Sequence, residues 1–304
     1  MAVTAQLVKE LREMTGAGMM DCKKALVETD GNIDKAVEVL REKGLAKAAK
    51  KAGRIAAEGL VKTAFSEDHR VASVIEVNSE TDFVAKNPEF IEFVENLAAM
   101  ALNEEDPSMD AFMGLAYEGE GTVQDALTSK ISKIGENMNI RRFQRMATSG
   151  VVYTGYIHGG GTIGVLVGIE TEATAAEIET VGKDVAMQVA SMNPKYVDET
   201  QVDKDWYESE KEIAIQTLLN EGKPEAMMDK IIPGKMKAIL KEVCLVDQKF
   251  VKNSDLTVAQ YVTEAGKAIG KDMKVVEMVR FEVGEGIEKK EEDFAAEVAA
   301  QINA

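Results

Sequence analysis

The sequence offers few side chains for covalent chemistry. It contains two histidines, His69 and His158, and two cysteines, Cys22 and Cys244. A histidine-based triad would have to use one of these histidines, and a metal site would have to rely on carboxylates. The two cysteines give neither a disulfide framework nor a zinc pattern, which predicts a reducing compartment. These counts limit the chemistry that the chain can support.

Residues 78–87, NSETDFVAKN, hold the most unusual neighbouring side chains. A β-branched run, VASVIEVN, leads into them, and a helical stretch, NPEFIEFVENLAAMAL, follows. Asn87 and Pro88 are typical of a helix start, with Asn as the cap and Pro at the first helical position. The preceding TDFVA is then predicted to be a free-standing turn. In it, Asp82 and Phe83 place a carboxylate beside a phenyl ring, and Asp82 has no capping duty.

Two interpretations of this pair are open. Phe83 could pack on the following helix as a hydrophobic staple, with Asp82 as a turn former. Alternatively, both side chains could face a partner. An internal duplication favours the second interpretation, because Thr174 and Ala175 stand at the matching place in the second copy. The scaffold does not require an Asp-Phe pair there.

A glycine-rich stretch, GGGTIG at 159–164, fits a dinucleotide-binding pattern, but it follows one strand and opens another instead of opening a helix. The preceding histidine completes an HGGG motif typical of esterases, but the chain has no G-x-S-x-G elbow. We interpret the stretch as a hairpin turn. His158 at its tip is either a solvated loop residue or a contact residue on a rigid hairpin. His69, in the equivalent turn of the first copy, is predicted to be a solvated loop residue.

The chain has 304 residues and a net charge of −17, with 53 acidic against 36 basic side chains. Phosphate binding needs a basic face, so direct binding to nucleic acid or to a membrane surface is disfavoured. The polar, amphipathic start has no signal-peptide core, and no apolar run could span a bilayer. We expect a cytoplasmic protein. The basic residues Lys47, Lys50, Lys51 and Arg54 are interpreted as a solvated linker face.

Residues 1–44 are predicted to form three short helices. Thr4 caps the first, and the third covers about 32–43 and ends at Gly44. The apolar face of the first helix consists of Leu7, Val8, Leu11 and Met14. Met19 and Met20 precede the second helix, at about 21–29, and could be core fillers or a soft, exposed partner surface. An Ala/Lys-rich linker, helical or mobile, follows Gly44.

The rest of the chain is an internal duplication. Residues 59–102 align with 150–193, and residues 122–142 align with 257–277, so the second copy carries an insertion of about 43 residues. This insertion, within 195–243, consists of two helical stretches broken at Gly222 and Pro224, which predicts an antiparallel hairpin. Its apolar stripe could be covered by a second copy of the chain or by the hairpin itself. The stripe includes Ile213, Ile215, Leu218 and Leu219.

The predicted fold class is α+β. A three-helix domain with its linker (1–54) precedes two related halves (55–147 and 148–280), each with a three-stranded antiparallel sheet and helices. A C-terminal module (281–304) closes the chain with a short helix that carries Phe294, Val298 and Ile302.

Six collinear blocks closely resemble the bacterial elongation factor Ts family, the guanine-nucleotide exchange factors for elongation factor Tu. They are LVKELREMTGAGMMDCKKAL, AAKKAG, EVNSETDFVAKN, KIGENMNIRR, IGVLVG and RFEVGEGIEKKEEDFAAEVAA. The resemblance covers essentially the whole length. It implies a ubiquitin-associated-like fold for the N-terminal domain. It also implies elongation factor Tu as the partner and no covalent chemistry, and with it no catalytic residues, no metal site and no cofactor.

The resemblance further implies roles for particular residues. The turn of Thr81, Asp82, Phe83 and Val84, above all Phe83, would enter between helices of the GTPase and dislodge its Mg²⁺. His158 would be a secondary contact, and Met19, Met20 and the C-terminal helix would dock the G domain from another side. A homodimer or a 2:2 complex is compatible with the hairpin. Two other classes stay open, a scaffold for ubiquitin-like partners and a hydrolase with paired carboxylates.

Overall fold

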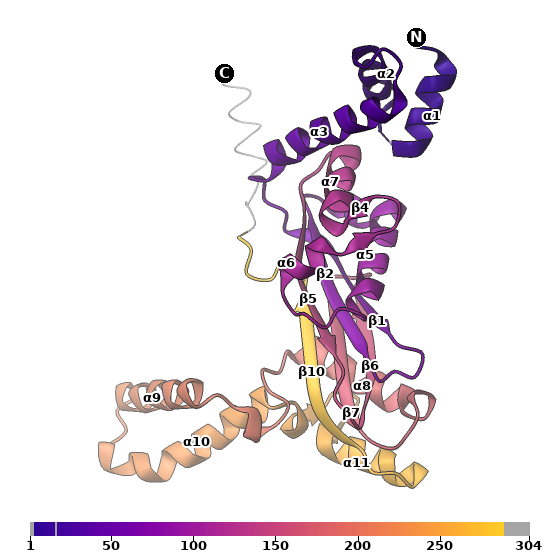
Figure 1. Ribbon diagram of the computed structural model, residues 1–304. Helices are drawn as coiled ribbons and strands as arrows, with labels where there is room; N and C mark the ends of the chain where they lie inside the picture. Colours follow the sequence, from indigo (N-terminus) through magenta and orange to yellow (C-terminus); the bar gives the residue numbers. More distant parts are fainter. Residues whose placement is uncertain (1–2, 16, 289–304) are drawn as a thin grey trace.

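The computed structural model describes residues 3–15 and 17–288. Figure 1 shows three helices at one end, two sheets along the middle and a helical hairpin that projects from the far end. The architecture is mixed α+β with small antiparallel sheets, which confirms the predicted fold class. The predicted C-terminal helix with Phe294, Val298 and Ile302 lies outside the described residues.

The N-terminal part consists of α1 (Ala5–Thr15), α2 (Met19–Glu28) and α3 (Ile33–Lys51). Thr4 caps α1 as predicted, since its Oγ1 accepts a hydrogen bond from the backbone N–H of Leu7 at 3.2 Å. Met14 was predicted to lie on the apolar face, but its side chain is exposed. The small core is formed by Val8, Leu11, Cys22, Ala25, Leu26 and Ala36.

The prediction that the third helix ends at Gly44 is wrong. Helix α3 continues to Lys51, and Gly44 is buried within it. A Cβ on Gly44 would lie 3.7 Å from the Cβ and Oγ of Ser132 on α7 (Val123–Ile134), an ordinary packing distance, so α3 lies against that helix at this point. Arg41 also pairs with Asp125 of α7. The segment after Gly44 is therefore a docked helix, which tertiary contact has extended beyond the expected end.

The predicted linker cations mostly bind within the chain. Lys47 lies 2.8 Å from Asp21, Lys51 donates to the carbonyl of Gly135, and Arg54 lies 3.5 Å from Glu80. Two of these three contacts join the end of the N-terminal part to the first sheet region. The basic segment is thus not simply a solvated face.

The first half is a sheet of order β1-β2-β5 with helices on one face. Its strands are β1 (Glu58–Phe65), β2 (Ala72–Ser79) and β5 (Met138–Met146). Its further elements are α4 (Asp82–Ala85), α5 (Pro88–Ala101), α6 (Met109–Gly114), α7, β3 (Ala116–Tyr117) and β4 (Gly121–Thr122). Central strand β2 is buried along its whole length. Its alternate residues Ile75 and Val77 pack with α5 and α7 in the first core.

The second half repeats this plan with the sheet order β10-β7-β6. Its elements are β6 (Val151–His158), β7 (Ile163–Glu170), α8 (Ala175–Met192), β8 (Lys249–Phe250), β9 (Asn253–Thr257), α11 (Val258–Ile269) and β10 (Lys274–Glu282). The duplication is confirmed in detail by α7 and α11. Each begins at a threonine capping box, Thr122 or Thr257, and ends at a left-handed glycine, Gly135 or Gly270.

The two copies differ after their central strands. In the first, α4 and α5 are separate, because Pro88 has no N–H and keeps Asn87 extended (φ −71°, ψ 124°). Asn87 caps α5 as predicted, accepting from the N–H of Glu89 at 2.9 Å. In the second, α8 starts directly at a capping box formed by Thr174 and Glu177. The position that matches the Asp-Phe pair is therefore a helix start.

The inserted hairpin consists of α9 (Lys204–Asn220) and α10 (Met228–Val243). The 3₁₀ turn Glu225–Met227 lies between the two helices, and the 3₁₀ turns Glu199–Gln201 and Leu245–Asp247 lie before and after them. Figure 1 shows the two helices side by side, projecting away from the sheets. They share a core of Ala214, Leu218, Met228, Ile232 and Met236. The hairpin thus covers most of its own stripe, whereas Ile213 remains exposed. A second copy of the chain is not needed to bury it.

A third core joins the two sheets face to face. It is formed by Val61, Ala72, Val74, Met146, Val151, Tyr153, Leu166, Val279 and Phe281. On β2, Ala72 and Val74 face this layer, and strand alternation places Glu76 on the same face. An acidic side chain therefore enters the layer between the sheets, where a lone charge would be costly.

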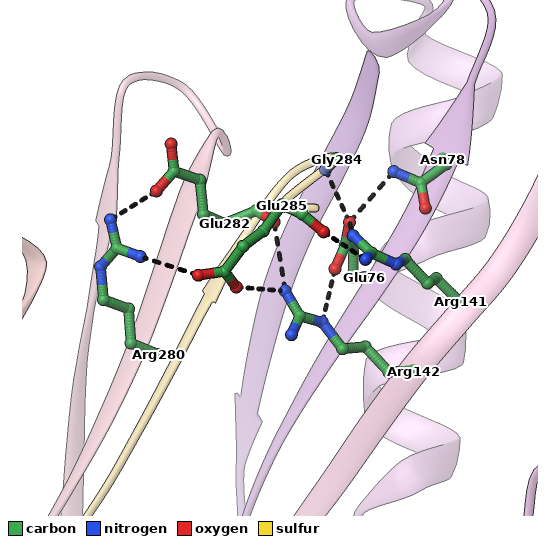
Figure 2. Close-up of polar contacts among 8 residues, drawn as sticks. All are labelled: Glu76, Asn78, Arg141, Arg142, Arg280, Glu282, Gly284 and Glu285. Atoms are coloured by element: carbon green, nitrogen blue, oxygen red, sulfur yellow. Dashed lines mark hydrogen bonds and ion pairs between the residues drawn. The ribbon is translucent and has the colours of Figure 1, made fainter. Parts of the chain in front are cut away.

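Figure 2 shows how the carboxylate of Glu76 is satisfied. Its Oε1 accepts from the backbone N–H of Gly284 at 2.8 Å, from Asn78 Nδ2 at 3.1 Å and from Arg141 Nη1 at 3.0 Å. Its Oε2 accepts from Arg142 Nε at 2.6 Å. Burial pushes the pKa of Glu76 upward, but these bonds outweigh it and hold the pKa below its ordinary value of 4.5. Because Gly284 follows β10, the cluster ties the first sheet to the second half.

We predict that this cluster contributes strongly to stability. Glu76→Ala should lower the free energy of unfolding by about 3 kcal/mol, because two arginines lose their buried partner. Glu76→Gln should cost less, since it keeps a hydrogen-bonding side chain of similar size. The folded-state pKa of Glu76 is lowered, so its stabilisation is present above the unfolded-state pKa and is lost as the pH falls through the folded value.

Urea denaturation at several pH values measures this effect. The difference in unfolding free energy between the wild type and Glu76→Gln should be largest at neutral pH and should narrow below about pH 4.5. Glu95→Gln is the matched control, because Glu95 pairs with Lys62 at the surface and should change stability by less than about 0.5 kcal/mol. If Glu76→Ala were as stable as this control, the assignment would be wrong.

Candidate functional site

The residues that follow β2 form a one-turn helix, not the free-standing turn predicted from the sequence. Thr81 is extended (φ −127°, ψ 155°), and α4 runs from Asp82 to Ala85. The backbone N–H of Asn87 bonds the carbonyl of Val84 at 2.9 Å, and Pro88 then prevents the turn from joining α5. The chain therefore presents a short, closed turn at the end of a fully buried strand.

The two faces of α4 have opposite environments. Val84 and Ala85 are buried in the core of the first half. Phe83 points away and is 80% exposed, more than any other large apolar side chain in the described part of the chain. The staple interpretation of Phe83 is therefore wrong, because a staple would be covered by the helix that it packs on. A phenyl ring held in water on a turn anchored from behind is suited to enter an apolar site on a partner.

Asp82 lies at the first position of α4 and pairs with Lys86, with 2.6 Å between Oδ2 and Nζ. The hydrogen bond from Lys86 lowers the pKa of the Asp82 carboxyl, so this group is ionised at neutral pH. Both side chains are exposed, and exposed ion pairs are weak. The carboxylate is therefore available to another donor.

The base of the turn is held by a second set of polar contacts. Thr81 donates two hydrogen bonds to the carboxylate of Glu136, and Ser79 Oγ donates to the carbonyl of Thr81 at 3.0 Å. The next residue, Asn137, donates its backbone N–H to Glu80. Glu136 is not among the predicted site residues. The available signal was its place in KIGENMNIRR, where the second copy has a lysine, Lys271.

His158 is the exposed last residue of β6, and its Nδ1 lies 3.1 Å from the hydroxyl of Tyr156. The hairpin interpretation of the glycines is confirmed. Gly161 has φ +115°, its carbonyl accepts from the N–H of Val61 at 2.8 Å, and a Cβ there would lie 2.6 Å from Leu60 Cδ2. The hairpin tip is therefore fixed on β1, the strand that α4 also contacts. Helix α4 and the hairpin tip thus contact the same strand.

His69 differs from its predicted role as a solvated loop residue. It is half-buried, its Nδ1 lies 2.9 Å from the carbonyl of Tyr153, and its ring stacks on Phe65 with 4.9 Å between centroids. The backbone N–H of Tyr153 also bonds the carbonyl of His69 at 2.8 Å. This histidine joins the first half to the second and has a structural role.

Met19 and Met20 lie in the first turn of α2 and are 56% and 61% exposed, which excludes the core-filler interpretation. They belong to α2, which lies among the N-terminal helices at one end of the molecule (Figure 1). The structure therefore brings α4 and the hairpin tip to one strand, whereas the methionines lie on a separate helix.

Two negative findings apply to residues 3–15 and 17–288. In these ranges no three His, Cys, Asp or Glu side chains are grouped so that they could bind a metal ion. None of the helices in these ranges is both long and apolar enough to cross a membrane.

Comparisons with known proteins agree with these motifs. Residues 80–285 match the family model described as Elongation factor TS. The chain is 57% identical over 300 residues to Elongation factor Ts of Clostridioides difficile (strain 630), with 99% of each chain covered. It is 55% identical over 302 residues to Elongation factor Ts of Clostridium tetani (strain Massachusetts / E88), again with 99% of each covered. The chain therefore belongs to the elongation factor Ts family.

Proposed function

We propose that this protein binds the GDP-bound form of elongation factor Tu and promotes release of the nucleotide, so that GTP can bind. The observation that carries the mechanism is the 80% exposure of Phe83 on a turn whose opposite face is buried. Such a ring gains contacts only when a partner covers it. The Thr81–Val84 turn is therefore the element that acts on the GTPase.

The proposed action is displacement of the partner's Mg²⁺. This ion demands near-ideal octahedral geometry and is held by few protein ligands together with phosphate oxygens and water. A rigid phenyl wedge that shifts one helix of the GTPase spoils that geometry. The Asp82 carboxylate, released from Lys86, would accept hydrogen bonds from groups that order the metal's water ligands. No covalent step is needed, so the protein acts as an exchange factor and not as an enzyme with chemistry of its own.

Linkage sets the size of the effect. If the protein binds the nucleotide-free GTPase more tightly than the GDP-bound form, it weakens GDP by the same factor. Phe83 and Asp82 contribute only to the extent that their contacts are better in the nucleotide-free complex. His158 provides a secondary contact from the adjacent hairpin tip, and Met19 and Met20 dock the GTPase through the N-terminal helices.

We predict that Phe83→Ala slows release of fluorescent GDP from elongation factor Tu by about 30-fold. This factor corresponds to an interface anchor worth about 2 kcal/mol, since about 1.4 kcal/mol is tenfold. Asp82→Ala should also slow release, and the double variant should be less than additive because the two side chains act together. Stopped-flow fluorescence with excess unlabelled nucleotide measures the rate.

Stability provides the control for these variants. Phe83→Ala should leave the free energy of unfolding within about 0.5 kcal/mol of the wild type, as expected for a surface substitution. The buried neighbour Val84, changed to Ala, should lose about 2 kcal/mol. If Phe83→Ala unfolded early yet released GDP at the normal rate, the ring would be a core residue and the mechanism would fail.

We predict a different effect for the methionine surface. Met19→Ser combined with Met20→Ser should weaken binding to the nucleotide-free GTPase by about tenfold, measured by calorimetry, while release at saturating protein changes little. The reason is that these residues dock the partner without touching the turn. Val27→Ser, on the same helix and 58% exposed, is the matched control and should bind normally. Equal losses in both variants would argue against a specific docking role.

A further inference from the structure

Glu136 binds the residue at which the Phe83 turn begins. The backbone N–H of Thr81 lies 3.0 Å from Oε2, and Thr81 Oγ1 lies 2.7 Å from Oε1. Both oxygens of one carboxylate are thus occupied by one residue, which fixes the position and the extended backbone of Thr81 together. Hydrogen bonds to an ionised acceptor are about twice as strong as neutral ones.

The connection that carries Glu136 binds Thr81, the first residue of the turn, and Glu80, the residue before it. It joins α7 to β5 and consists of Gly135, Glu136 and Asn137. Asn137 donates its N–H to Glu80, and its side-chain amide donates to the carbonyl of Arg54 at 2.7 Å. Since α4 is a single turn, its direction is set at one end by these bonds and at the other by the burial of Val84 and Ala85.

The internal duplication shows that the scaffold does not need an acid at position 136. The connection between α11 and β10 is built in the same way, from Gly270 onward, but the matching residue is Lys271. Lys271 Nζ lies 2.7 Å from Glu177 in the capping box of α8. In the second half, which has no exposed aromatic turn, a basic residue therefore makes the contact at the position where the first half has the acidic Glu136. A carboxylate at this position is thus found in the half that has the Phe83 turn, and the shared fold does not require it.

We propose that Glu136 is a positioning residue for nucleotide release, which holds the Thr81–Val84 turn in the orientation from which Phe83 enters the GTPase. This inference rests on the proposed function. Without the two bonds the turn samples other orientations, and the effective rate falls with the fraction of molecules in the competent one. Both oxygens of Glu136 are occupied by Thr81, so in this role its effect on release passes through Phe83.

The test measures fluorescent-GDP release from elongation factor Tu with the full-length chain. Glu136→Ala should slow release about tenfold. Glu136→Gln should stay within about twofold of the wild type, because its amide can accept from the N–H of Thr81 and donate to Oγ1. In a Phe83→Ala background, Glu136→Ala should slow release less than twofold further. Lys271→Ala, which breaks the ion pair at the matching corner, should leave release unchanged.

The Phe83→Ala background separates positioning from a general loss of structure, which would slow release equally with or without the ring. Thr81→Val is a milder second variant for the case that Glu136→Ala folds poorly, because it removes only the hydroxyl bond to Glu136. It should slow release about threefold, and this effect should vanish in the Phe83→Ala background. If Phe83→Ala alone leaves release unchanged, the proposed function fails. If Phe83→Ala slows release but removal of the Glu136 contacts does not, or slows it equally in both backgrounds, the positioning role is overturned.

Discussion

The arrangement of the two halves depends on the desolvated carboxylate of Glu76. A charge between two sheets is tolerated only if every lone pair has a partner, and its partners come from β2, from β5 and from the turn after β10. A small slide of one sheet over the other would break several of these bonds at once. The apolar layer around Val74 and Tyr153 favours contact between the sheets, and the carboxylate selects one register for that contact. Because β2 carries Glu76 and ends at Ser79, the same contact positions the Thr81–Val84 turn.

Duplication explains how one scaffold carries both a structural half and an exposed turn. Both copies use threonine caps and left-handed glycines to set α7 and α11, so their frames are nearly the same. They diverge where Pro88 interrupts the helix in the first copy and Thr174 starts it in the second. The interruption leaves four residues as the separate helix α4, in which Val84 is buried in the core and Phe83 is exposed to solvent. Pro88 thus separates α4 from α5, and the separate turn of α4 leaves the side chain of Phe83 exposed.

Much of the fold could be predicted from sequence patterns that depend only on residues close to one another in the chain. Helix caps at Thr4 and Asn87, the hairpin at 159–161 and the duplicated strands follow from local chemistry, and all were predicted correctly. The errors have long-range causes. Helix α3 continues through Gly44 because Ser132, far along the chain, lies against it, and His69 is held by Tyr153 of the other half. The contact between Glu136 and Thr81 was missed for the same reason, because nothing near Glu136 in the sequence shows that Thr81 is its partner.

The turn combines a fixed base with a tip that is easily rearranged. At the base, Thr81 is held twice by a half-buried carboxylate, and Val84 is locked in the core. At the tip, Asp82 is paired only with Lys86, in a contact that water competes for. The Asp82–Lys86 contact is therefore the one a partner could replace at little cost, whereas the contacts at the base fix the start of α4 and with it the direction of Phe83. Conformational entropy of the turn has already been lost in folding, so under the proposed mechanism more of the contact energy of Phe83 would be available to distort the partner's metal site.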